Sequence, residues 1–210
     1  MIKLQDKDLK IDAPIEVDFI CNSMRLMFLE LDWLSHGYNI ANALYRNGTK
    51  LKFQRVQGNS KFVYPETYAG PEGQDYGYHR LTPDNDYSGM VFFVIGNEEY
   101  RFNDINIDSL VGYDVSAIFS VNLELIDKER LQKGLFTQEL IRDVRRLLRK
   151  YDGSFKFQYR LQRVSRDIRQ VYREFILDEK EQYNRAPMQC FRFDFRVAIW
   201  EDCLTDEELS

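Results

Sequence analysis

Apolar positions recur every three or four residues near the start of the chain. From Ile15 to Arg46 they form one face, which predicts two helices with a kink between them or one long bent helix. Asn47-Gly48, which tolerates left-handed backbone, ends this segment. Further on, the unbroken apolar run Met90 to Ile95 predicts a buried strand, and Gly96-Asn97 predicts a turn after it.

Shorter strands are expected between these two elements, over 51–56 and 61–64. In the second half of the chain, apolar and polar residues alternate in long stretches, which is typical of half-buried strands. The expected elements there are a strand over 113–126, a helix capped by Thr137 and stopped at Asp152-Gly153, a strand over 155–161, a short helix capped by Ser165, and the strand CFRFDFRVAIW over 190–200. This order predicts an α+β fold, with an N-terminal helical segment and a long loop packed on an antiparallel or mixed sheet with flanking helices.

The length of 210 residues suits one large domain, or one domain with a lobe. We divide the chain into 1–112, with the N-terminal helices, a long aromatic loop and strands, and 113–210, an α+β core. Gly112 ends a linker-like region between the two parts. The two parts are expected to form one compact unit.

Charge is distributed unevenly along the chain. The formal net charge is −5, which disfavours general nucleic-acid binding. The stretch from Arg142 to Arg173 is strongly basic, whereas Glu201 to Glu208 is acidic. The basic stretch could follow a phosphate backbone, with Phe157 or Tyr159 as stacking platforms. We favour a solvated helix face, or arginines that pair with an acidic surface of a neighbouring subunit.

The cysteines and the N-terminus predict a soluble protein that folds in a cytoplasm. Cys21, Cys190 and Cys203 are odd in number and irregularly spaced, so reduced thiols are expected. The first residues carry charges where a signal peptide would need an apolar region. The longest apolar run, Met90 to Ile95, is too short to span a bilayer.

The segment from Asp84 to Gly89 matches the first six positions of an EF-hand calcium loop. The twelfth position, where a bidentate Glu belongs, is Ile95, and Pro83 precludes a regular entering helix. A turn rich in Asx hydrogen bonds is therefore favoured over a calcium site. A zinc site is disfavoured as well, because the chain has two histidines and no CxxC pair.

Motifs for catalysis and nucleotide binding are sparse in this sequence. There is no Gly-x-Ser-x-Gly elbow, no Gly-x-Gly-x-x-Gly and no phosphate-binding Gly-Lys-Ser/Thr. A Cys21–His36 dyad, or a cysteine paired with His79, remains open as a third hypothesis, a Cys–His hydrolase. We expect a protein without catalytic activity, metal or cofactor.

The segment from Lys61 to Gly96 is expected to be a long loop that binds a partner. Its tyrosines are amphipathic residues typical of protein interfaces, and its prolines reduce the entropy lost on docking. The predicted interface consists of Tyr64, Pro65, Tyr68, Tyr76, Tyr78, His79, Pro83, Tyr87, Arg142, Arg145 and Arg149.

Several short motifs resemble neck and tail proteins of crAss-like tailed phages. In that family a Trp-Leu helix precedes a Pro-x-x-Tyr-x-Gly segment, a Leu-x-Pro-Asp-Asn turn and a Phe-Phe strand. The matching positions are Trp33-Leu34, Pro65/Tyr68/Gly70, Leu81/Pro83/Asp84/Asn85 and Phe92-Phe93. The order of elements in the second half is similar to that of tail-terminator or tail-completion proteins.

The resemblance implies a structural virion protein without catalysis. Six or twelve copies would form a ring in the neck or tail, contacting adjacent portal, neck and tail proteins and no membrane. Genome DNA would pass through the lumen without specific binding, and the long loop would be an arm toward a neighbouring subunit or ring. The protein would belong to the virion, and to the host cytoplasm during assembly.

Overall fold

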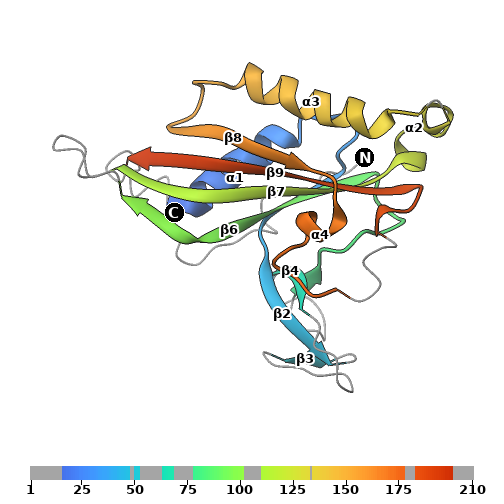
Figure 1. Cartoon of the computed structure of the whole chain (residues 1–210), viewed down its shortest axis with the longest axis horizontal. Coiled ribbons are helices and arrows are strands. Elements are labelled where there is room, and N and C mark those ends of the chain that lie inside the picture. Colours follow the sequence, from blue (N-terminus) through green and yellow to red (C-terminus); the bar gives the residue numbers. More distant parts are fainter. Residues whose placement is uncertain are drawn as a thin grey trace.

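The computed structural model describes residues 16–47, 50–52, 63–68, 78–101, 110–132, 134–177 and 183–200. It confirms an α+β fold with a mixed sheet and flanking helices (Figure 1). The elements in chain order are α1 (Glu16–Phe28), β1 (His36–Ile40), β2 (Asn42–Asn47), β3 (Lys50–Lys52), β4 (Tyr64–Tyr68), β5 (Tyr78–Arg80), β6 (Gly89–Arg101), β7 (Leu110–Asn122), α2 (Leu123–Leu131), α3 (Phe136–Lys150), β8 (Phe157–Ser165), α4 (Ile168–Val171) and β9 (Met188–Trp200).

The main sheet has five strands in the order β1-β6-β7-β9-β8. β1 runs parallel to β6, and the other pairs are antiparallel. The register places Ala117 between Phe93 and Phe193, so apolar residues of three strands line up on one face. Because β6 pairs with β7, the sheet is continuous across Gly112, which lies inside β7.

The larger core lies between this face of the sheet and the helices α1 and α3. Phe28 of α1 packs edge-on against Phe119 at 5.1 Å between ring centroids, and Phe119 stacks on Phe191 at 5.0 Å. All three rings are fully buried. Burial of each such side chain stabilises the fold by about 1.5–3 kcal/mol, so these aromatic contacts fix the position of α1 on the sheet.

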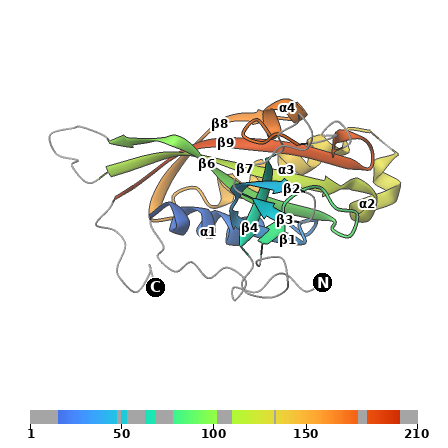
Figure 2. The same ribbon diagram turned by 90° about the horizontal axis from the view of Figure 1, so that it is seen from below.

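A smaller core covers part of the opposite face. Tyr172 and Phe175, which follow α4, pack with Phe92, Ile118 and Cys190 of the sheet. Figure 2 shows α1 and α4 on opposite sides of the long strands. The remainder of this face carries charged and polar side chains.

A second, antiparallel sheet has the order β3-β2-β4-β5. Figure 1 shows β2 and β3 projecting away from the five-stranded sheet. At its base, Val63 exchanges two backbone hydrogen bonds with Ile176, of 2.9 and 3.0 Å, which ties the second sheet to the segment after α4. We call β2 and β3 together the β2–β3 arm.

The helix expected up to Arg46 is wrong beyond Phe28, because β1 and β2 occupy most of that stretch. Gly37 and Asn39 are weak helix formers, and the strand lies close to α1. A Cβ atom at Gly37 would stand 3.0 Å from Cγ of Arg25. Glycine therefore permits a close contact between β1 and α1 that the helical spacing did not reveal.

The turn expected at Gly96-Asn97 is also wrong, because β6 continues to Arg101 with a register shift between Ile95 and Glu99. A Cβ at Gly96 would lie 3.0 Å from Cβ of Asp114, so the glycine accommodates close approach of β7. At the other end, β7 stops at Asn122 rather than at residue 126.

Both predicted helix caps differ from those observed. Leu135 precedes α3 with φ of 56°, so Thr137 lies inside the helix, and Asp167 rather than Ser165 caps α4. The strand expected over 51–56 is described only as β3, with 53–56 outside the described residues. Of the strand expected over 61–64, residues 61 and 62 lie outside the described residues, Val63 forms an isolated bridge and Tyr64 begins β4.

Candidate interaction sites

The expected long loop is wrong where the chain forms β4 and β5. These strands pair antiparallel, with Thr67 opposite His79 and Tyr68 opposite Tyr78. β4 has the sequence YPETY, which gives little apolar signal beyond Tyr64, so the expected strand over 61–64 did not extend into it. Tyr76 lies outside the described residues, and Tyr68 and Tyr78 are described only as backbone of the pair.

Tyr64 and Pro65 hold the second sheet together inside the subunit. Tyr64 is 6% exposed, and the guanidinium carbon of Arg80 lies 3.6 Å from its ring centroid. Pro65 is buried, and its carbonyl accepts a hydrogen bond of 2.8 Å from the Leu81 amide. Neither residue is presented on the surface of the subunit.

Both histidines of the chain meet in an aromatic cluster between the two sheets. Tyr38 of β1 stacks on His79 of β5 at 5.3 Å between ring centroids, and on His36 at 6.3 Å. The ring centroids of Tyr87 and His36 lie 4.0 Å apart. Of these four residues, the predicted interface contained His79 and Tyr87 but not His36 and Tyr38, because the latter two were expected in a helix. We call these four residues the histidine–tyrosine cluster.

Burial lowers the pKa of both histidines in this cluster. His79 lowers the pKa of His36 further, whereas Asp84 and Glu66 oppose the effect of burial on His79. Both rings are therefore neutral at pH 7, and the cluster joins β1 to β5 by stacking rather than by charge.

The segment from Asp84 to Gly89 forms a turn, as favoured over the calcium site. The Asp86 amide donates to Oδ1 of Asp84 at 3.0 Å, the bond of an Asx turn. Ser88 Oγ donates to the Trp33 carbonyl at 3.0 Å, and Gly89 then begins β6. Pro83 is half-buried beside this turn. Within the described residues, no group of three or more His, Cys, Asp or Glu side chains is arranged to hold a metal ion.

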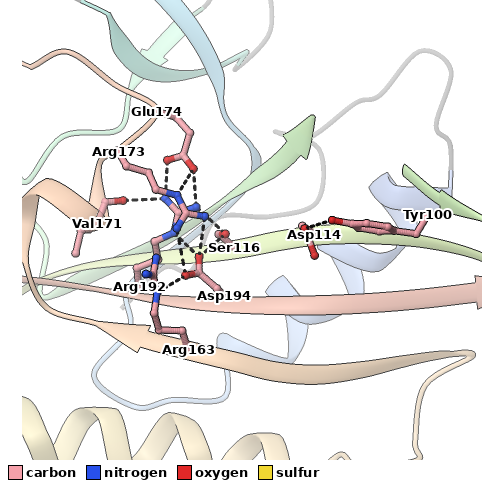
Figure 3. A network of polar contacts seen from close by, with 9 residues as sticks. All are labelled: Tyr100, Asp114, Ser116, Arg163, Val171, Arg173, Glu174, Arg192 and Asp194. Atoms are coloured by element: carbon pink, nitrogen blue, oxygen red, sulfur yellow. Dashed lines mark hydrogen bonds and ion pairs between the residues drawn. The ribbon is translucent and has the colours of Figure 1, made fainter. Parts of the chain in front are cut away.

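The face of the sheet opposite α1 contains a buried arginine, Arg192 of β9, which is 1% exposed (Figure 3). Its Nη atoms donate to the two carboxylate oxygens of Glu174 at 2.5 and 2.6 Å, and its Nε donates to Asp194 at 2.6 Å. Two more bonds reach the Val171 carbonyl, at 3.1 Å, and Ser116 Oγ, at 2.7 Å. The five donors of the guanidinium are therefore all satisfied.

Two exposed arginines extend this network toward solvent. Arg163 of β8 contacts Asp194 at 3.1 Å, and Arg173 contacts it at 3.4 Å. Burial alone would raise the pKa of Glu174 and Asp194, but hydrogen bonds and the charge of Arg192 outweigh it and hold both pKa values below their ordinary range. Part of the basic stretch expected to face a partner is thus paired within the subunit.

A second group of arginines surrounds a groove of about 380 Å³ between α3 and β8. Arg145 and Arg149 are exposed on one side of α3, and Arg160 is exposed on β8. The remaining lining residues are Leu148, Asp152, Tyr159 and Leu161. We call this site the basic groove. Arg142, also predicted for an interface, is exposed on α3 but does not line it.

Tyr159 fixes the floor of the basic groove. Its hydroxyl donates to the Leu148 carbonyl at 2.6 Å, which joins β8 to the last turns of α3. Burial, followed by the negative charge of Asp152, raises the pKa of Tyr159, so the hydroxyl keeps its proton at neutral pH. Sequence reasoning identified the arginines but could not show that two elements bring three of them together.

The two described cysteines are buried in different cores. Burial raises the pKa of Cys21, which lies on α1, and raises the pKa of Cys190, on β9, to about 12. A thiol with a raised pKa is a poor nucleophile, so the burial of Cys21 and Cys190 gives the Cys–His hydrolase hypothesis no support. Cys203 lies outside the described residues.

None of the described helices is long and apolar enough to cross a membrane. Comparison of the chain with protein-family models, with curated proteins and with solved structures gives no match.

Proposed function

We propose that this protein is a structural subunit of the neck or tail of a tailed phage. Copies would assemble into a ring of six or twelve around the DNA channel and join the portal side to the tail. The proposal rests on one structural observation, the projecting β2–β3 arm, and on the sequence resemblance to neck and tail proteins. It assigns no catalytic step to the chain.

The β2–β3 arm has the properties of a segment that binds another chain. β3 is three residues long and is the edge strand of the second sheet. Its outer backbone N–H and C=O groups therefore pair with none of the described strands. A two-stranded hairpin is marginally stable in water on its own. Pairing of this edge with a neighbouring subunit would satisfy its backbone groups and stabilise the arm.

The base of the arm is held firmly. β4 pairs with both β2 and β5, with Ala43 opposite Pro65 and Glu66 opposite Arg80. The histidine–tyrosine cluster then joins β5 to β1 of the main sheet. An arm with a fixed base loses less entropy when it docks, which suits a contact repeated around a ring.

Native mass measurement of the purified full chain tests this proposal. The intact protein should form assemblies of six or twelve subunits. A variant in which residues 45–52 are replaced by Gly/Ser of equal length should remain monomeric and folded, with the circular-dichroism bands of its helices kept, because the core residues of the body lie outside this segment.

Lys128→Ala is a matched control, since Lys128 is exposed on α2, away from the arm, and pairs with Glu124. This variant should assemble like the intact chain. An intact chain that stays monomeric, alone and with particle extracts, would contradict the proposal.

A second candidate, a nucleic-acid-binding module, draws support from the basic groove and from exposed Arg142. It predicts salt-dependent binding of short DNA or RNA that is weakened by Arg145→Glu and Arg149→Glu. We rank it below the ring, because two arginines of the basic stretch, Arg163 and Arg173, pair with Asp194. Absence of binding at low salt would dismiss it.

A further inference from the structure

The side chains of the three arginines of the basic groove form no ion pair with the described residues. The guanidinium groups of Arg145, Arg149 and Arg160 make no ion pair or hydrogen bond with the described residues, although other arginines nearby are paired. Asp152 is the single acidic residue among those that line the groove. Leu148 and Leu161 add apolar surface between the charges. The site therefore suits an acidic ligand that also carries apolar groups.

The chain itself contains a segment of this composition. Residues 201–208, EDCLTDEE, contain five acidic residues, no basic residue and one leucine. The segment directly follows Trp200, the last residue of β9. Its charge is opposite to that of the groove, and its composition matches the groove's lining.

The position of the groove brings it within reach of this segment. Ile199 of β9 is opposite Phe157, the first residue of β8, so β9 ends where β8 begins. Arg160 lies three residues along β8, about 10 Å from that point at the rise of a strand. An extended segment of eight residues spans about 26–29 Å. Figure 1 shows that the C-terminal end of α3 lies at the same end of the sheet.

We propose that the acidic segment 201–208 occupies the basic groove of its own chain. Its carboxylates pair with Arg145, Arg149 and Arg160, and Leu204 contacts the apolar part of the lining. β8 is the last strand in the order of the main sheet, so an extended segment can also approach its outer edge. This inference concerns the isolated subunit and does not depend on the formation of a ring.

The same-chain arrangement is favoured over two other occupants. A segment attached at Trp200 acts at an effective concentration on the order of millimolar, above that of a second copy in dilute solution. Nucleic acid would have to approach a protein of net charge −5 and displace this segment. Only an acidic partner that binds the basic groove more strongly than the chain's own segment would then displace that segment.

A fluorescent peptide with the sequence of residues 201–210 tests the proposal in the full chain. The recipient is a neutralised variant, E201Q/D202N/D206N/E207Q/E208Q, whose own segment should no longer fill the groove. Fluorescence anisotropy at low salt should show that this variant binds the peptide about tenfold more tightly than the unmodified chain. In the unmodified chain the peptide must first displace the chain's own acidic segment, which breaks two or more exposed ion pairs. Equal binding to both proteins, or none to either, would overturn the proposal.

Charge reversal locates the binding site. In the neutralised variant, R145E/R149E should weaken peptide binding about tenfold, since both arginines line the groove. Arg142→Glu, on the same helix but outside the groove, is the control and should weaken peptide binding less than R145E/R149E, because Arg142 does not line the groove and is not expected to contact the peptide. Equal effects of the two changes would show general attraction to a basic helix and contradict a specific site.

Two further outcomes would assign the groove to another occupant. If neutralisation dissociates assemblies of the unmodified chain, the segment lies in the groove of a second copy, and the same-chain proposal is wrong. If short single-stranded DNA binds the unmodified and neutralised proteins equally, the segment does not cover the groove. A ring that forms normally in the neutralised variant would leave the proposed function intact, so the two proposals can fail separately.

Discussion

Arg192 carries a full charge in the interior of the molecule, and its partners decide how it affects stability. Because all of its donors are bonded, the guanidinium and the carboxylates of Glu174 and Asp194 form a complete network. Loss of the arginine would leave two carboxylates close together, with side-chain exposures of 32% and 14%. The network therefore ties the segment after α4 to β9.

Replacement of Arg192 by methionine, which keeps most of the volume, should lower the free energy of unfolding by about 3–5 kcal/mol. Urea denaturation measures the change. Arg196→Met is the control, because Arg196 is half exposed and pairs with Asp114 at 3.4 Å. That change should cost no more than about 1 kcal/mol. A similar small cost at both positions would show that the buried network contributes little.

His36 and His79 should make stability depend on pH near neutrality. Their pKa values are lowered in the folded state, so the folded protein binds protons less readily than the unfolded chain. Their contribution is complete above an unfolded-state pKa of about 6.5 and is lost as the pH falls through the lower folded-state values.

Urea unfolding between pH 7.5 and pH 5 should therefore show falling stability in the unmodified protein. H36Q/H79Q should flatten this dependence, because it removes both titrating rings. An unchanged slope in the double variant would mean that other groups cause the pH dependence.

At the scale of elements, Asn122 separates β7 from α2. Its side-chain oxygen accepts from the amides of Glu124 and Leu125 at 3.1 and 3.3 Å, which caps the helix and ends the strand. Asn122→Ala should lower the free energy of unfolding by about 1 kcal/mol. Asn122→Asp should lower it much less, since both Asn and Asp are good caps. Equal losses in the two variants, measured by thermal or urea unfolding, would argue that the cap is not the cause.

Elements with a strong local pattern were predictable from the sequence. Phe191, Phe193 and Phe195 alternate in β9 as they do in its sequence, and the apolar stripe of α3 predicted that helix. β1 was not predictable, because its five residues follow a helical spacing and its partner, β6, lies about 50 residues away in the chain. Such a contact is not encoded in local periodicity.

The candidate sites were predictable only as residue types. A tyrosine such as Tyr64 can be an exposed anchor or a buried side chain, and the pairing of β4 with β5, which brings Arg80 onto its ring, decides which. Arg192 occupies a polar position in an alternating strand, which suggests a solvent-exposed face. The segment after α4 covers it, and the sequence of β9 does not contain that information.

At the scale of the whole molecule, a body of two layers carries a second sheet that projects from it (Figure 1). The two cores and the Arg192 network stabilise the body, while β3 offers an open strand edge far from both cores. This division between a stable body and an extended arm is what the ring proposal requires of one subunit.

Electron microscopy of the purified full chain tests the ring proposal most directly. Two-dimensional averages should show closed rings of six or twelve copies, and the variant with Gly/Ser over residues 45–52 should show single particles. Averages in which the intact chain appears only as single subunits, at concentrations where the protein is folded, would contradict it.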